Sequence, residues 1–144
     1  MNKTILDTKE NETYKWYVID ANSKRLGRIS TEISRILLGK NSPSYSPNTE
    51  IKHSVIVINA DKVEVTGKKN SDKFYRRHSG RPGGLTIETF EELKQRIPNR
   101  IIEKSVKGML PKGRLGRKLF NNLKVYAGEG HPHASQKPEM VNLD

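Results

Sequence analysis

Two short apolar runs on either side of a helical pattern place the strongest limit on how this chain folds. Residues 16–20 (WYVID) and 55–60 (VIVINA) read as buried strands, the second as one covered on both faces. Between them, apolar residues recur at helical spacing from Leu26 to Leu37, and Gly39 stands where a helix ends. This order predicts a right-handed crossover between two parallel strands. A chain of 144 residues has room for one such domain.

The rest of the chain predicts further elements that prolines separate. Pro98 ends one helical pattern and suits the first turn of the next, and Pro111 stops that second helix. We expect Thr86 to cap the first of these helices. The expected elements are a polar loop at 40–49, short strands at 62–65 and 123–127, and helices over 90–97, 101–109 and 115–120.

A long basic run without acids is the strongest indication of function. Residues 104–128 contain seven Lys or Arg residues and no Asp or Glu, and five of these cations lie within 107–118. A polyanion that neutralises such a run releases condensed counterions, which favours binding. A solvated helix face is the alternative, but such faces usually mix both signs. The run predicts contact with nucleic acid, and its repelling cations and glycines predict that 107–118 gains order on binding.

A second basic cluster spans residues 67–84. It holds six Lys or Arg residues and one acid, Asp72, with Phe74 and Tyr75 between the cations. Aromatic rings beside cations can stack on unpaired bases while the cations hold phosphate. The alternative is that the rings pack on the core, which we favour for Phe74. The glycines around Pro82 allow close approach of a ligand, or they mark ordinary turns.

The tetrapeptide Arg-Leu-Gly-Arg occurs twice, at 25–28 and at 114–117. Each copy falls at the expected start of a helix, where free N–H groups and two arginines favour phosphate binding. Chance repetition is the alternative, with Leu26 and Leu115 acting as core anchors.

The composition narrows the class of partner. The formal net charge is +11 and the sequence pI is about 9.9, which suits a nucleic-acid-binding protein. A membrane partner is not expected, because no stretch is apolar enough to cross a bilayer and no basic amphipathic helix has a broad apolar face. The absence of cysteine excludes disulfides, thiolate metal sites and thiol catalysis. Residues 1–15 are mixed in charge, which does not suit a secretory signal or a transit peptide.

Other candidates for chemistry have plainer interpretations. His131 and His133 raise the question of a metal, but without cysteine or nearby acids we favour RNA contact or a surface role. Residues 20–27 have the strand–turn–helix layout of a nucleotide site but lack a glycine fingerprint. The acids within 88–92 lie at the expected start of a helix, where the dipole favours them. No catalytic residue is predicted.

Several segments, taken in order, resemble one protein family. They are residues 16–40, 55–69, 73–84, 106–128 and 131–138, which include the elements HSGRPGG, KGMLP and HPH. Together they are similar to the bacterial-type large-subunit ribosomal proteins of the universal L-thirteen family. Lys52 and His53 stand where that family commonly has a Gly-Asp pair, so no role of an acid is carried over there.

The resemblance implies a fold and a function. It implies a three-layer α/β/α domain with a small, mainly parallel sheet over residues 16–128, an arm at 1–15 and a tail at 129–144. It also implies a non-enzymatic constituent of the large ribosomal subunit that binds 23S-type RNA and supports early subunit assembly. Neighbouring ribosomal proteins are expected partners and messenger RNA is a further candidate. No cofactor, metal or small-molecule substrate is expected, and the expected location is the ribosome of a bacterial cytosol or of an organelle such as a plastid.

The candidate RNA contacts come from the two basic clusters, the repeated tetrapeptide, the histidines at 131 and 133, and Lys40 at the start of the polar loop. They are Arg25, Arg28, Lys40, Lys68, Lys69, Lys73, Arg76, Arg77, His78, Arg81, Lys107, Lys112, Arg114, Arg117, Lys118, Lys124, His131 and His133. Two alternatives remain open at this point: an enzyme that acts on a nucleotide through the crossover unit, and a free messenger-RNA-binding regulator.

Overall fold

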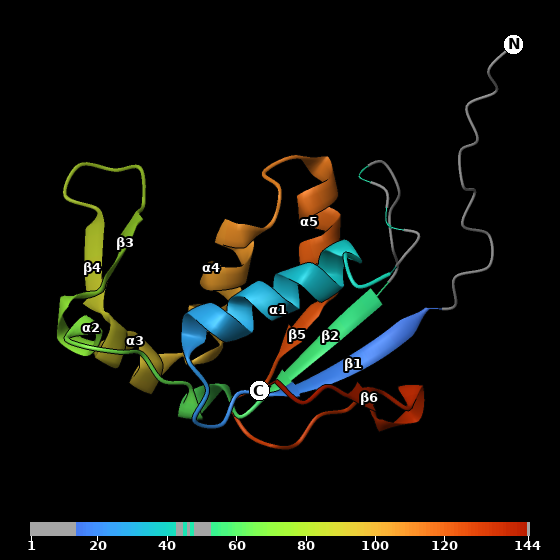
Figure 1. Cartoon of the computed structure of the whole chain (residues 1–144). Helices are drawn as coiled ribbons and strands as arrows, with labels where there is room; N and C mark the ends of the chain where they lie inside the picture. Colours follow the sequence, from blue (N-terminus) through green and yellow to red (C-terminus); the bar gives the residue numbers. More distant parts are fainter. Residues whose placement is uncertain (1–13, 43–44, 46, 48–52, 144) are drawn as a thin grey trace, which may run out of the picture.

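The computed structural model describes residues 14–42, 45, 47 and 53–143 (Figure 1). Residues 1–13 of the expected arm and residues 43, 44, 46, 48 and 49 of the expected loop lie outside the described residues. The elements are β1 (Lys15–Asp20), α1 (Leu26–Leu38), β2 (His53–Ile58), the 3-10 turn η1 (Ala60–Lys62), α2 (Lys69–Asp72), β3 (Phe74–His78), β4 (Leu85–Thr89), α3 (Phe90–Arg96), α4 (Asn99–Met109), α5 (Arg114–Asn121), β5 (Leu123–Val125), the 3-10 turn η2 (Ala134–Gln136) and β6 (Glu139–Met140).

The predicted crossover forms the centre of the molecule. β1 and β2 pair in parallel along their whole length, from Lys15 opposite His53 to Asp20 opposite Ile58. β5 joins β2 and β6 joins β1, also in parallel, so the sheet has the order β5-β2-β1-β6. This confirms the prediction of an α/β fold with a mainly parallel sheet. Residues after Gly128 contribute its edge strand β6.

Apolar side chains of β2 are buried on both faces of the sheet. Val55 and Val57 belong to the larger core cluster, whereas Ile56 belongs to a smaller cluster on the opposite face. Alternation of side chains along a strand explains this division. It also explains why the second apolar run is continuous rather than alternating.

The two faces of the sheet are covered differently. Apolar residues of α1, α3, α4 and α5 complete the larger core cluster, and Figure 1 shows α1, α4 and α5 on one side of the sheet. Among the described residues, the smaller cluster is packed by Trp16 and Tyr126 instead. No described α-helix contributes to that cluster, so the second helical layer of the expected three-layer α/β/α arrangement is not observed on this face, where aromatic side chains pack instead.

The end of α1 follows the sequence prediction. Gly39 adopts the left-handed conformation, with φ of 71°, and its N–H bonds to Arg35 and Ile36 carbonyls. Glycine reaches this conformation without the steric cost that a Cβ atom would add. The helix thus stops where the polar segment begins.

Two local predictions are wrong. Residues 62–65 do not form a strand, because η1 occupies Ala60–Lys62 and only Glu64 bridges to Arg25. Thr86 does not cap α3, because it lies within β4. The cap is Thr89, whose side chain accepts a bond from the Glu92 N–H while the Glu92 carboxylate accepts one from the Thr89 N–H. This reciprocal capping box becomes visible only once the strand before the helix is known.

A β-hairpin that the sequence did not predict lies between these elements. β3 and β4 pair antiparallel, from Phe74 opposite Thr89 to His78 opposite Leu85. Gly80 and Gly83 in the connecting loop have φ of 88° and 74°, so both need the freedom of glycine. The glycines of this segment therefore serve the turn, the plainer of the two interpretations.

A search of the described part of the chain finds no helix with the length and apolar character needed to cross a membrane.

Candidate nucleic-acid interface

The hairpin divides the second basic cluster between two faces. Because side chains alternate along a strand, Phe74, Arg76 and His78 share one face, and Tyr75 and Arg77 share the other. Tyr75 packs against the larger core cluster, whereas Phe74 has an exposed fraction of 54%. The prediction that Phe74 packs on the core is therefore wrong. Because side chains alternate along β3, Tyr75 packs on the core in place of Phe74.

The outward face of the hairpin combines apolar groups with cations. Leu85 and Ile87 stand opposite His78 and Arg76, and their exposed fractions are 54% and 50%. Large exposed apolar groups that gather on one face usually mark a contact surface. Together with Phe74 they give the hairpin apolar surface beside its charges.

Two lysines surround the Tyr75 ring at the base of the hairpin. The Lys104 and Lys73 Nζ atoms lie 4.9 and 5.5 Å from the ring centroid, which suits cation–π attraction. Burial lowers the pKa of Lys73, and the nearby charge of Lys69 adds to this effect. Burial also raises the pKa of the Tyr75 hydroxyl. The positive charges of Lys69 and Lys73 are thus close enough to disfavour one another unless an anion binds.

The hairpin arginines are available to a ligand. Glu88 of β4 pairs with Arg96 of α3 at 2.6 Å, which ties the hairpin to the helix. Among the described residues, Arg76 and Arg77 have no ion-pair partner, and both are exposed. Their charges can therefore be neutralised by phosphate without breaking an ion pair of the described residues.

The other basic segment, residues 107–118, is folded rather than loose. It begins in the last turn of α4, crosses a short loop and enters α5. Leu110 in the loop is buried, with an exposed fraction of 4%. A Cβ atom added to Gly116 would lie 1.7 Å from the Pro111 carbonyl oxygen, so the loop and α5 are in close contact. Glycine and proline here support packing, and the expected gain of order on binding stays a prediction.

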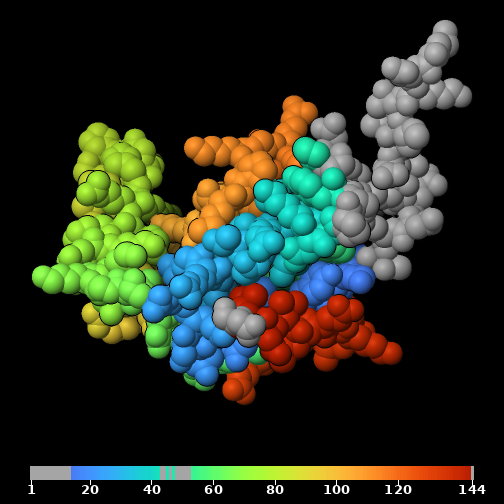
Figure 2. All heavy atoms as spheres, in the orientation of Figure 1, coloured from blue at the N-terminus to red at the C-terminus, as the bar shows by residue number. Residues whose placement is uncertain are grey.

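The two basic segments extend on the same side of the molecule. Figure 1 shows the hairpin and the loop between α4 and α5 both projecting beyond α1. The space-filling view shows an open notch between them (Figure 2). Segments about thirty residues apart in the sequence can therefore face one extended ligand.

The first copy of the repeated tetrapeptide joins this surface in part. Arg25 lines a pocket of about 550 Å³ together with Lys69 and Lys73, between the start of α1 and α2. Arg28 lines a different pocket. Lys40 follows the opposite end of α1, about 20 Å away for a helix of this length. The structure thus brings Arg25, but not Lys40, to the hairpin cluster.

Lys124, His131 and His133 lie elsewhere. Lys124 of β5 is in register with Ile56 of β2, which belongs to the smaller core cluster. Lys124 therefore lies on the face of the sheet opposite α1. His133 packs beside Trp16, with ring centroids 5.1 Å apart, and its Nε2 atom lies 2.9 Å from the Tyr126 hydroxyl oxygen. Within the described ranges, no group of three His, Asp or Glu side chains is placed to hold a metal ion. His133 therefore has a structural role in holding the tail.

The carboxyl edge of the sheet, where open α/β sheets bind ligands, is occupied by protein contacts. The Asn59 side-chain amide donates to the Asp20 carboxylate at 2.9 Å, and this bond lowers the pKa of Asp20. The Asn59 N–H donates to the Gly128 carbonyl oxygen at 3.0 Å. These contacts favour a structural role for the crossover over the nucleotide-enzyme alternative.

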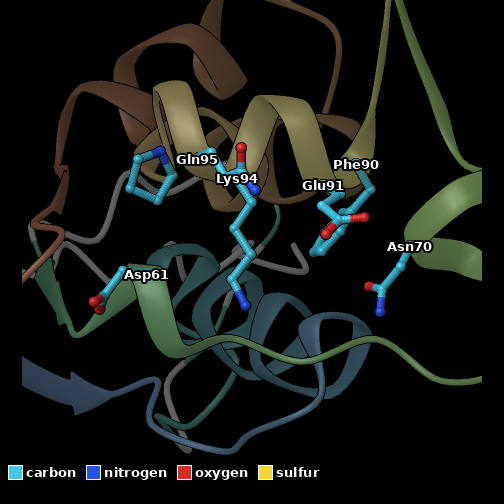
Figure 3. Close-up of a pocket in the computed structure, with 7 residues that line it drawn as sticks. Asp61, Asn70, Phe90, Glu91, Lys94 and Gln95 are labelled. Carbon is cyan, nitrogen blue, oxygen red and sulfur yellow. The ribbon is translucent and has the colours of Figure 1, made fainter.

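A pocket beside α3 does not favour that alternative either. It measures about 450 Å³, and Figure 3 shows Asp61 and Asn70 on opposite sides of it with Lys94 between them. The Lys94 Nζ atom donates to the Val63 carbonyl oxygen at 2.9 Å. Two acids, Asp61 and Glu91, line this pocket, so it is poorly suited to phosphate.

Two residues of this surface were missed as candidates. Lys104 belongs to the acid-free run, but its place over the Tyr75 ring depends on the packing of α4 against the hairpin. Phe120 lines a pocket with Lys107 and Arg117. Helical spacing indicated only that Phe120 faces inward, and no local signal could show that part of its ring lines a cavity.

The chain is similar to known ribosomal proteins. The protein-family model described as "Ribosomal protein L13" matches residues 14–132 of this chain. The chain is 60% identical over 144 residues to the large ribosomal subunit protein uL13 of Crocosphaera subtropica, covering 100% of this chain and 95% of that relative. The uL13 protein of Synechocystis has the same identity and coverage. The uL13c protein of Guillardia theta is 59% identical over 138 residues, covering 96% of each chain.

The family model spans most of the chain, and the relatives match it over nearly their full length at high identity. The family elements lie where the structure places the hairpin, the α4–α5 segment and the tail. The chain therefore belongs to the ribosomal protein L13 family.

Proposed function

We propose that this chain is a structural constituent of the large ribosomal subunit that binds large-subunit RNA of the 23S type and supports early subunit assembly. The observation that carries the proposal is the placement of two acid-poor basic segments on one side of a rigid α/β domain (Figure 2). Because these cations contact phosphate rather than base edges, they position the protein more than they read sequence.

The proposed interface has a centre and a second surface. Its centre is formed by Lys68, Lys69, Lys73, Arg76, Arg77, His78 and Arg81 of the hairpin region together with Lys107, Lys112, Arg114, Arg117 and Lys118. Arg25 extends this centre beyond α2. Lys124, His131 and His133 supply contacts on the other face of the sheet, where RNA or a neighbouring ribosomal protein can bind.

Sedimentation of a cell lysate tests the proposed location. The tagged chain should co-sediment with large subunits and remain with them after messenger RNA is digested. The physical reason is that a constituent held by ribosomal RNA does not depend on messenger. A chain found only in light messenger-bound fractions would support the regulator alternative and contradict this proposal.

Replacing Arg76 and Arg77 together by alanine should weaken RNA binding far more than it lowers stability. Both side chains are exposed without ion-pair partners, so each change should alter the free energy of unfolding by no more than about 0.5 kcal/mol. Loss of two phosphate contacts should make the slope of log affinity against log salt shallower by about 2. Thermal melts and RNA titrations of the double variant measure both quantities.

A control removes two exposed cations outside the basic segments, Lys15 and Arg35, with the same substitution. Because Arg35 pairs with Glu32 at 3.1 Å, this control applies to the salt slope and not to the melting temperature. Its salt slope should stay close to that of the unaltered chain. A large fall in melting temperature with unchanged affinity in the Arg76 and Arg77 variant would show that these arginines are structural.

A further inference from the structure

A pocket in the α4–α5 segment has the composition of a nucleotide subsite. It measures about 460 Å³, which is within the range of small-ligand sites. Its lining comes from the last turn of α4, the following loop and one face of α5. It therefore lies inside the acid-free basic run.

The charge of its lining separates this pocket from three others on the surface. Lys107, Lys112 and Arg117 line it, and no Asp or Glu does. The pocket beside α3 and the two pockets near the start of α1 each include at least one acidic residue. Three cations without a compensating acid favour an anionic occupant.

An aromatic ring gives the same pocket an apolar surface. Phe120 packs against the larger core cluster and also lines the pocket, so the ring is anchored by the protein and partly accessible. The Lys107 Nζ atom lies 5.7 Å from the ring centroid. The flexible Lys107 side chain can move from the Phe120 ring to a phosphate group. A planar base can then stack on the ring.

The backbone around the pocket is held in place by close packing. Gly116 approaches the Pro111 carbonyl oxygen so closely that any larger residue would force the loop away from α5. Because both residues line the pocket, its shape is set before a ligand arrives. A preformed site loses less conformational entropy on binding.

We propose that this pocket binds one unpaired nucleotide of the RNA, with its base against the Phe120 ring and its flanking phosphates on Lys112 and Arg117. This inference rests on the proposed function, because it assigns a nucleotide to one place within that interface. A base stacked on a side chain discriminates single-stranded from paired RNA without reading sequence.

Two substitutions at one position test the proposal. Phe120→Leu keeps an apolar side chain but removes the ring, whereas Phe120→Tyr keeps the ring. Affinity for a large-subunit RNA fragment should fall about 5-fold to 150-fold in Phe120→Leu and stay near that of the unaltered chain in Phe120→Tyr. The salt slope should be unchanged in both, because no cation is lost. Melting temperatures establish that the variants compared are folded.

The outcomes distinguish this inference from the proposed function. If the unaltered chain does not bind the RNA fragment, the proposed function fails. If the chain binds and Phe120→Leu binds equally well, the nucleotide subsite is overturned while the proposed function stands. Equal losses in both variants would show that only the packing of Phe120 matters, which also overturns the subsite. Unchanged RNA affinity with reduced incorporation into large subunits would assign the pocket to a neighbouring protein instead.

Discussion

The affinity of this chain for a large-subunit RNA fragment should fall about 250-fold when monovalent salt rises from about 50 mM to about 200 mM. The estimate assumes that about five phosphates are neutralised, which gives a slope of log affinity against log salt of about −4. The basis is the pair of basic segments, whose eleven Lys and Arg residues include Arg76 and Arg77 without ion-pair partners among the described residues. Filter binding or fluorescence anisotropy at several salt concentrations measures the slope.

The place where a mononucleotide binds separates the two classes of function. A nucleotide-acting enzyme would bind it at the crossover unit, so NMR shift changes at residues 20–27 on adding a mononucleotide at physiological salt would support that class, and we expect none there. A slope near zero with the RNA fragment would contradict the electrostatic account of the interface.

Gly116→Ala should lower the free energy of unfolding by about 3 kcal/mol, at the upper end of what an overpacked position costs. The added Cβ atom would lie 1.7 Å from the Pro111 carbonyl oxygen and 2.7 Å from the carbonyl carbon. Both are backbone atoms, so relief requires the loop and α5 to separate. Chemical denaturation of the purified chain measures the change.

Gly108→Ala is the matched control in the neighbouring helix. A Cβ atom at Gly108 meets nothing within 4 Å, so alanine should stabilise α4 by about 0.5–1 kcal/mol through its better helix propensity. Equal effects of the two substitutions would mean that the close contact of α5 with Pro111 is not a constraint on the fold. The Gly116 variant should also lose RNA affinity, because the same contact shapes the pocket.

Sequence reasoning was most successful where a strong local pattern coincides with burial. The apolar run at 55–60 led to β2, and helical spacing with Gly39 led to α1 and its end. These elements were predictable because their side-chain periodicity reflects which faces are buried. The same reasoning identified Pro98 and Pro111 as boundaries of α4, since proline restricts the backbone wherever it stands.

Reasoning from sequence failed in the basic segment between residues 67 and 89. The cations conceal strand alternation, so the sequence pattern does not indicate the hairpin and points to Thr86 rather than Thr89 as the helix cap. The hidden alternation also makes Phe74 look like the core residue. In the structure, Tyr75 packs on the core and Phe74 is exposed. Local propensity is a weak guide when both faces of a strand carry charge.

The amino-acid sequence by itself determined the crossover unit, the end of α1, the boundaries of α4, the family and the presence of two acid-poor basic clusters. Except for the family, whose motifs are spread along the chain, each of these is encoded by residues close together. Tertiary structure alone decided that the hairpin and the α4–α5 segment extend on one side, that Lys124 and His133 lie on the other face of the sheet, and that Phe120 lines a pocket among cations. The reason is physical: charge and periodicity are local properties, whereas a shared surface depends on how distant elements pack against one core.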